Sequence, residues 1–150
     1  MPQSLSKVYV RITFSTKNRE NTIDDSIKER LFEYKVGICK GMDCKPVKIG
    51  GHYGHIHILC LLSRKIAQTQ LLENIKKEST KWIKTIGDKY INFHWQNGYG
   101  IFSKNPSEID IVTDYINNQK EHHKKKNFKD EYLAFLKKYN VEYDEKYLWD

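Results

Sequence analysis

Apolar and polar residues alternate over residues 7–14 of the chain, "KVYVRITF". Successive side chains of an extended strand point to opposite faces, so such a stretch places one row of side chains against a core. The apolar row consists of Val8, Val10, Ile12 and Phe14, and the residues between them are Tyr9, Arg11 and Thr13. The pattern predicts a half-buried strand.

Two later stretches repeat apolar residues at helical spacing. Between Asp24 and Cys39 the repeating positions are Ile27, Leu31, Tyr34 and Ile38, and an aspartate can cap the first turn. From Ala67 to Ile86 the apolar face is longer and consists of Leu71, Leu72, Ile75, Ser79, Trp82, Ile83 and Ile86. The lysines of the second stretch lie mainly off this face. The sequence therefore predicts two helices, the second amphipathic and basic.

The segment between these helices predicts a hairpin. Its paired glycines, Gly50 and Gly51, favour a turn that leads into an apolar strand from His55 to Leu62. Another strand is expected within residues 91–103, "INFHWQNGYGIFS". The order strand, helix, strand, strand, helix, strand is that of an α+β, ferredoxin-like or RRM-like split βαβ sandwich, with an antiparallel sheet and helices on one face. The other face of the sheet would remain available for a site.

The C-terminal third predicts two more helices. Pro106 is suited to the first turn of a helix that runs over about residues 106–125, and "NFKDEYLAFLKKY" predicts a short helix after it. No repeat, low-complexity tract or Pro/Gly/Ser linker divides the chain. We therefore expect a single domain over residues 1–150, with a core at about 7–104, a helix at about 106–125 and a helical tail at about 128–150.

Charge and cysteine usage narrow the class of partner. The 150 residues carry a formal net charge of +7, which favours a polyanionic partner, above all nucleic acid. No apolar stretch is long enough to span a bilayer, and no signal peptide is evident, so no membrane partner is expected. Three cysteines without a CxxC pair suit reduced thiols. These features predict a cytoplasmic protein.

Two histidines, His55 and His57, stand one residue apart in the apolar run "GHIHILCLL". Residues i and i+2 of a strand share a face, so the two imidazoles would project together from the sheet and provide half of a metal site. In the helix after Pro106, Tyr115 and Gln119 are four residues apart and share a helix face. A tyrosine hydroxyl and a carboxamide oxygen could thus face the histidines.

This combination resembles a family, the small insertion-sequence transposases that carry a HUH motif (His, hydrophobic, His) and a single catalytic tyrosine, including those associated with repeated palindromes of bacteria. The resemblance is carried by "GG" before "HIHIL", by the "YINNQ" helix and by "WQNGYGIFS" ahead of it. The segments "VYVRITFSTKNR" and "EHHKKKNFKDEYLAFLKKYNV" also look like the family. Immediately before the first histidine, where members commonly carry an acidic or other polar residue, this chain has Gly54.

The resemblance implies a transposase that acts on single-stranded DNA and is associated with the nucleoid when bound to DNA. His55, His57 and Gln119 would bind a divalent cation, Mg²⁺ or Mn²⁺, and the C-terminal helix would carry Tyr115 as the nucleophile. Tyr115 would form a 5′-phosphotyrosine intermediate, and a 3′-OH would later rejoin the strands without ATP. Members recognise hairpins near the ends of the element. The resemblance also implies a homodimer in which the tyrosine helix of one subunit completes the HUH site of the other.

Basic side chains are the candidates for phosphate contacts, whose strength falls with salt. They are Arg11, Arg19, Lys76, Lys77, Lys81, Lys124, Lys125 and Lys126. His122 lies seven residues beyond Tyr115, nearly on the same helix face, and is a possible proton carrier or alternative metal ligand.

Two other functions fit the same residues. A non-catalytic RRM-like module would bind single-stranded nucleic acid through its basic helix and aromatic side chains, and would not need Tyr115 or a metal. A metal-dependent phosphoesterase would use His52, His55 and His57 to activate water, and would leave no covalent adduct. Tyr53 occupies the position two before His55, which disfavours a triad of alternating histidines.

Overall fold

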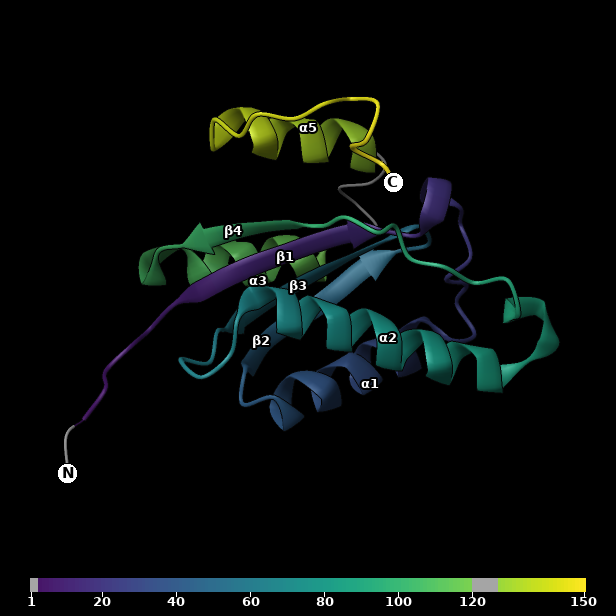
Figure 1. Cartoon of the computed structure of the whole chain (residues 1–150), viewed down its shortest axis with the longest axis horizontal. Helices are drawn as coiled ribbons and strands as arrows, with labels where there is room; N and C mark the ends of the chain where they lie inside the picture. The colour runs from purple at the N-terminus through teal and green to yellow at the C-terminus, as the bar shows by residue number, and fades with distance from the viewer. Residues whose placement is uncertain (1–2, 120–126) are drawn as a thin grey trace.

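A four-stranded antiparallel sheet forms the centre of the protein, seen in a computed structural model that describes residues 3–119 and 127–150 (Figure 1). The strands are β1 (Tyr9–Ser15), β2 (Lys45–His52), β3 (His55–Leu61) and β4 (Gly100–Lys104), in the order β2-β3-β1-β4. The helix α1 (Lys28–Gly41) connects β1 to β2, and α2 (Gln68–Ile86) connects β3 to β4. This order is that of a split βαβ sandwich, so the predicted α+β fold is confirmed.

The alternation of β1 sets which face of the sheet meets the main core. Ile12 of β1 is opposite Ile58 of β3 and Ile101 of β4. Ile12 and Ile58 are fully buried in a cluster that includes Leu31 of α1 and Ile75 of α2. A slip by one residue would turn this apolar row away from the helices, so the pairing register is strongly specified. Figure 1 shows α1 and α2 together on this side of the sheet.

The opposite face of the sheet is covered in part by two further helices. The helix α3 (Ile109–Asn117) packs Val112 and Ile116 against Leu59 of β3. The helix α5 (Phe128–Lys138) packs Phe128, Tyr132 and Leu136 against Phe102 of β4. In Figure 1, α5 lies across the sheet from α1 and α2. The face that the sequence leaves available for a site is therefore partly covered by α3 and α5.

Two local predictions are wrong in detail. Gly50 and Gly51 do not form the turn of the hairpin, because both belong to β2, and the turn falls at Tyr53 and Gly54. A Cβ atom at Gly50 would lie 2.7 Å from Cγ2 and 2.8 Å from the carbonyl oxygen of Ile116, so this glycine serves the close packing of α3. Most of residues 91–99 is not strand, because Trp95 is drawn into the core, edge to face with Phe14.

The helix expected over 106–125 is described only in part. A 3₁₀ turn, η3 (Pro106–Glu108), precedes α3, and the positions from 120 to 126 lie outside the described residues. Two other short turns are η1 (Lys17–Arg19) and η2 (Asp88–Tyr90). Over residues 3–119 and 127–150, no helix combines the length and the apolar content needed to cross a bilayer.

Candidate active site

The two histidines of β3 point to the same face of the sheet, as the alternation requires. Their ring centroids are 5.2 Å apart, and their rings are nearly perpendicular. Ile56 and Ile58 point the other way, into the core under α1 and α2. The exposed fractions of His55 and His57 are 1% and 0%, so α3 and α5 enclose both imidazoles.

Local hydrogen bonds fix the start of the 3₁₀ turn η3, which runs directly into α3. The side chain of Asn105 accepts a hydrogen bond from the backbone N–H of Ser107 at 3.0 Å, and the carboxylate of Glu108 accepts one from the backbone N–H of Asn105 at 3.1 Å. This reciprocal capping, with Pro106 in the first turn, determines where η3 begins, and α3 continues from it at Ile109. Together with the contact of Ile116 on β3, it directs Tyr115 towards the histidines.

Gln119 lies just beyond α3 and reaches His55. Its Oε1 is 2.9 Å from Nε2 of His55, and its Nε2 donates a hydrogen bond to the carbonyl oxygen of Tyr115 at 3.3 Å. Because the amide nitrogen is directed at a carbonyl, the oxygen is the atom that faces the imidazole. The structure therefore brings together three of the residues singled out in the sequence, His55, His57 and Gln119.

Tyr115 is half-buried beside the same cluster. Its ring centroid is 6.4 Å from that of His57, and the guanidinium carbon of Arg11 lies 4.8 Å from the centre of its ring. Burial and the carboxylate of Glu131 raise the pKa of Tyr115 to about 12, against the opposing effect of the Arg11 charge. The hydroxyl thus lies among the charged groups of the site and is protonated at neutral pH.

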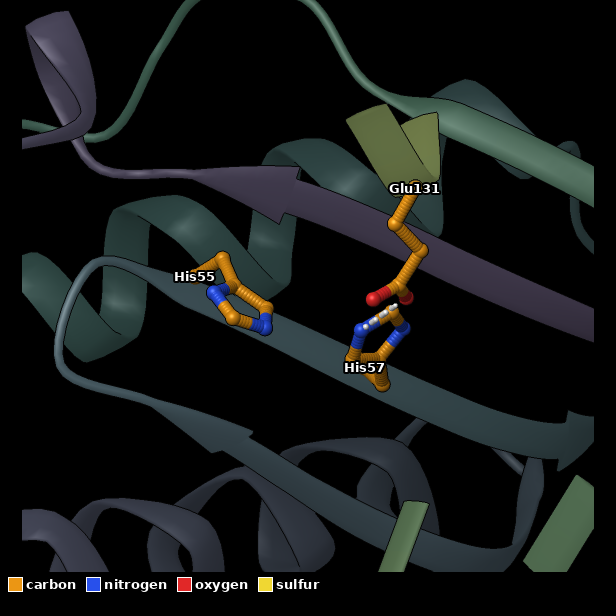
Figure 2. A group of neighbouring side chains, drawn as sticks. All are labelled: His55, His57 and Glu131. Carbon is orange, nitrogen blue, oxygen red and sulfur yellow. Dashed lines mark ion pairs between the residues drawn. The ribbon is translucent and has the colours of Figure 1, made fainter. Parts of the chain in front are cut away.

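A residue that sequence reasoning missed, Glu131, completes the cluster from α5. Its Oε1 is 2.9 Å from Nε2 of His57 (Figure 2). The same oxygen is 3.4 Å from Nη2 of Arg11. The side chain of Asn127 caps α5 at the backbone N–H of Asp130, and Phe128 stacks on the ring of His55 with centroids 4.5 Å apart. The available signal was an acidic residue on the apolar face of a predicted helix, since Glu131 stands between Phe128 and Leu136.

The chemistry of these side chains fits a divalent cation. One ligand atom each from His55, His57 and Glu131 lies within 4.8 Å of the other two. Adjacent ligand atoms of an octahedral site with bonds of about 2.1 Å lie about 3 Å apart, close to the separations of the pairs His57–Glu131 and His55–Gln119. Within the described residues, Nε2 of His57 is buried and makes no hydrogen bond of normal geometry despite its nearness to Glu131.

The protonation states agree with metal binding. Burial lowers the pKa of His57, so its imidazole is neutral and can act as a ligand. Burial opposes the ionisation of Glu131, but interactions with His57 and the charge of Arg11 more than compensate and hold the pKa of this carboxyl below its usual range. The site therefore offers the neutral imidazole of His57 and an ionised carboxylate, together with the imidazole of His55 and the amide oxygen of Gln119.

The basic residues singled out in the sequence are dispersed. Arg11 is buried within the site, whereas Arg19 is exposed and stacks over Trp149. Lys76 donates hydrogen bonds to the carbonyl oxygens of residues 96, 97 and 98, at 2.8, 3.1 and 2.6 Å. Lys77 and Lys81 are exposed and line a groove of about 560 Å³ between α2 and residues 94–99. His122, Lys124, Lys125 and Lys126 lie outside the described residues.

His52, the third histidine that a water-activating phosphoesterase would use, does not join the cluster of His55, His57 and Glu131. His52 stacks on Tyr53, and its ring centroid is 6.4 Å from that of His55. In the part of the chain that the structure describes, the cluster of His, Cys, Asp and Glu side chains able to hold a metal contains Glu131 and not His52.

Comparison with known proteins identifies the family. The model of the family described as "Transposase IS200 like" matches residues 4–119. This chain belongs to the IS200-like transposase family. The resemblance seen in the sequence is thereby confirmed, and a DNA-processing enzyme is supported. The family match ends at Gln119, so it includes both histidines and Tyr115 but not α5.

Solved structures share the fold of this IS200-like transposase. A candidate transposase from Deinococcus radiodurans R1 has a TM-score of 0.62 at 15% sequence identity, over 79% of this chain and 98% of that chain. A REP-associated tyrosine transposase bound to a REP hairpin has a TM-score of 0.60 at 16% identity, over 82% of this chain and 73% of that chain. No curated protein matches the chain.

Proposed function

We propose that this protein is a DNA transposase that cleaves and rejoins single-stranded DNA through Tyr115, with residues 1–150 acting as one catalytic unit. The observation that carries the proposal is the convergence of three elements on one point. β3 supplies His55 and His57, and α5 supplies Glu131. Tyr115 comes from α3, and Gln119 comes from the residues just after it. Membership in the IS200-like family supports the reaction class.

His55, His57, Gln119 and Glu131 are the residues that would hold Mg²⁺ or Mn²⁺. When bound, the cation would neutralise charge on the scissile phosphate and polarise its phosphorus. Arg11 contributes a permanent positive charge over the ring of Tyr115, which stabilises the phenolate relative to the phenol. Phe128 covers the ring of His55 and limits the access of water to it.

The reaction would conserve the phosphodiester bond. The hydroxyl oxygen of Tyr115 attacks phosphorus and loses its proton, a bond forms between this oxygen and the 5′-phosphate, and the bond to the 3′-oxygen breaks. The leaving 3′-oxygen takes up a proton and becomes a free 3′-OH. Attack by another 3′-OH on the phosphotyrosine reverses the same bond changes and joins two strands. Each step exchanges one ester for another, so ATP is not needed.

Hairpin ends are the proposed recognition element. The support is that the REP-associated tyrosine transposase, which shares the fold, was solved bound to a REP hairpin. Arg19, Lys77 and Lys81 are exposed on this chain and could contact phosphates, while unpaired bases can be splayed and stacked on aromatic side chains. We propose single-stranded DNA with hairpin ends as the substrate.

The test is the detection of a covalent protein–DNA adduct. Labelled single strands from both flanks of the gene are incubated with the protein and Mg²⁺ or Mn²⁺, and adducts are resolved on a denaturing gel. We expect an adduct on one strand that disappears in Tyr115→Phe and in excess chelator. Tyr147→Phe is the matched control, because Tyr147 is 59% exposed on the C-terminal segment.

Two outcomes would assign another function. Binding of the strands without any adduct, with either cation, would support the non-catalytic RRM-like module. Metal-dependent cleavage that releases both products, without an adduct and without loss in Tyr115→Phe, would support a phosphoesterase that activates water.

A further inference from the structure

A cavity of about 250 Å³ opens onto His55 at the edge of the candidate site. One wall is formed by Arg19 and Asn21, which follow β1. The other wall is formed by Asn127, Phe128 and Lys129 at the start of α5. This cavity contains a residue of the catalytic cluster, yet the reaction outlined above gives it no role.

The wall residues have the chemistry of a nucleotide site. Arg19 and Lys129 are exposed cations that can bind phosphate oxygens, and Asn21 and Asn127 carry amides that can pair with the edge of a base. Phe128 provides an apolar surface. Pockets for drug-sized ligands occupy about 300–1,000 Å³, so this smaller cavity has room for one nucleotide unit at most.

Gly54 explains why the loop of residues 19–21 can form one wall of the cavity. A Cβ atom at position 54 would lie 3.0 Å from the carbonyl oxygen of Arg19 and 3.2 Å from Oδ1 of Asn21. Any side chain at this position would therefore push the loop of residues 19–21 away from the strand. Glycine lets Asn21 take the space directly before the first histidine, where a side chain at position 54 would otherwise stand.

Arg19 is held in place at the rim. Its guanidinium carbon lies 4.5 Å from the ring centre of Trp149, and its backbone N–H donates a hydrogen bond to the carbonyl oxygen of Thr16 at 2.9 Å. Asn18 and Arg19 both have left-handed backbone angles, with φ of 58° and 55°. Consecutive left-handed residues other than glycine are unfavourable and persist where the surroundings fix them, so the loop has a defined shape.

We propose that this cavity binds the nucleotide adjacent to the scissile phosphate. Arg19 and Lys129 hold its phosphate, and Asn21 contacts its base. This inference rests on the proposed function for the position of the scissile phosphate, and it adds a residue, Asn21, that selects the base at the cleavage site.

The binding test needs neither metal nor catalysis. Amide NMR spectra of the full chain are recorded in excess chelator with deoxythymidine 3′,5′-bisphosphate, with the abasic deoxyribose bisphosphate and with inorganic phosphate. We expect the nucleotide to shift the signals of Asn21, Gly54 and Lys129. Arg19→Ala should weaken its binding about tenfold, as expected for the loss of one charge-assisted contact. Asn21→Ala should remove the preference for the nucleotide over the abasic compound.

Arg30→Ala is the matched control. Arg30 is an exposed residue of α1 whose guanidinium carbon lies 5.5 Å from the ring centre of Trp82, so the same contact between arginine and tryptophan is lost away from the cavity. This variant should bind the nucleotide as the unmodified chain does. Equal shifts with inorganic phosphate and with the nucleotide would show a simple anion site, and no shifts at these residues would show no site. Either result would overturn the inference.

Failure of this inference can be told apart from failure of the proposed function. The adduct test reports on Tyr115 and the metal, whereas the NMR test is done without metal and forms no covalent bond. An adduct without nucleotide shifts at the cavity would leave the transposase reaction in place and remove only the base-selecting site.

Discussion

At the scale of single residues, Lys35 of α1 combines a charge with complete burial. Its Nζ lies 3.4 Å from Oγ of Ser79 and 4.2 Å from the ring centre of Trp95. Burial lowers the pKa of Lys35 to about 7, from an unperturbed value of 10.5. Between these two values the unfolded chain binds the proton and the folded chain does not, so the free energy of unfolding should rise with pH across this window.

We expect Lys35→Met to stabilise the protein at pH 6, where the lysine is charged in both states. Replacing a buried charge with an apolar side chain of similar length is often stabilising, by about 1–4 kcal/mol. The gain should shrink by pH 10, because the native lysine is then neutral when folded. Urea unfolding of both chains at pH 6, 8 and 10 measures the difference in their free energies of unfolding. Lys40→Met, an exposed change in the same helix, should show no such pH dependence. A Lys35→Met chain less stable than the unmodified chain at every pH would mean that the aromatic rings favour the cation.

The hydroxyl of Tyr115 provides a second test at this scale. Burial and the Glu131 carboxylate raise its pKa to about 12, while Arg11 lowers it. Glu131→Gln should therefore lower the pKa of Tyr115, and Arg11→Met should raise it. Tyrosines labelled at the ring carbon that bears oxygen report this titration by NMR in the presence of chelator, with Tyr115→Phe identifying the signal. Glu142→Gln, an exposed change in the C-terminal segment, should leave it unmoved. If Glu131→Gln left the pKa of Tyr115 unchanged, the carboxylate of Glu131 would not lie near the Tyr115 hydroxyl.

At the scale of elements, the contact between β2 and α3 sets where Tyr115 lies. A Cβ atom at Gly50 would meet both the side chain and the carbonyl oxygen of Ile116, and the backbone cannot yield without moving α3. We expect Gly50→Ala to lower the free energy of unfolding by about 1–3 kcal/mol. Adduct formation should fall further than the loss of folded protein explains, because Tyr115 is displaced. Urea unfolding and adduct yield on the same samples separate the two effects.

Gly37→Ala is the control for that change. Gly37 lies inside α1, and a Cβ atom there would meet nothing within 4 Å. Alanine should stabilise the helix by up to about 1 kcal/mol and leave adduct formation unchanged. A Gly50→Ala chain that forms adducts as fast as the unmodified chain would show that α3 can shift without cost to the site.

Sequence patterns predicted those parts of the fold and site that depend on local spacing. The alternation in β1 and the two histidines of β3 follow from the two-residue period of a strand, and Tyr115 and Gln119 follow from the turn of a helix. Glu131 could not be placed this way, since it is 74 residues from His57 and meets it only through the packing of α5. Lys76 shows the same limit, because no local pattern indicates that its charge binds three backbone carbonyls of residues 96–98.

At the scale of the whole molecule, the C-terminal residues tie α5 to the rest of the fold. The backbone N–H of Gly98 donates to the carbonyl oxygen of Asp150 at 2.9 Å, and Nε2 of Gln96 donates to that of Leu148 at 3.3 Å. Between them, Trp149 packs against Tyr132 of α5, with ring centroids 5.4 Å apart. The position of Glu131 in the site therefore depends on the segment before β4 and on the last residues of the chain.

A second question about the whole molecule is whether each active site is formed by one chain or by two. The family resemblance predicts a homodimer in which the tyrosine helix of one subunit completes the site of the other. Within one chain, however, the ring centroid of Tyr115 is already 6.4 Å from that of His57, and Arg11 contacts both side chains. We therefore expect that a mixture of Tyr115→Phe and His55→Ala chains forms no adduct above the level of either alone.

If each site were instead shared between two subunits, random exchange of Tyr115→Phe and His55→Ala chains would restore some adduct formation. Half of the dimers would then be mixed, each with one intact site, so adduct formation would recover to about a quarter of the level of the unmodified protein. The chains are denatured together and refolded before the assay, so that failure to exchange cannot mimic sites within one chain. A mixture of unmodified and Tyr115→Phe chains treated in the same way shows how much activity refolding preserves. Recovery near a quarter would establish shared sites and require α3 to leave its own sheet.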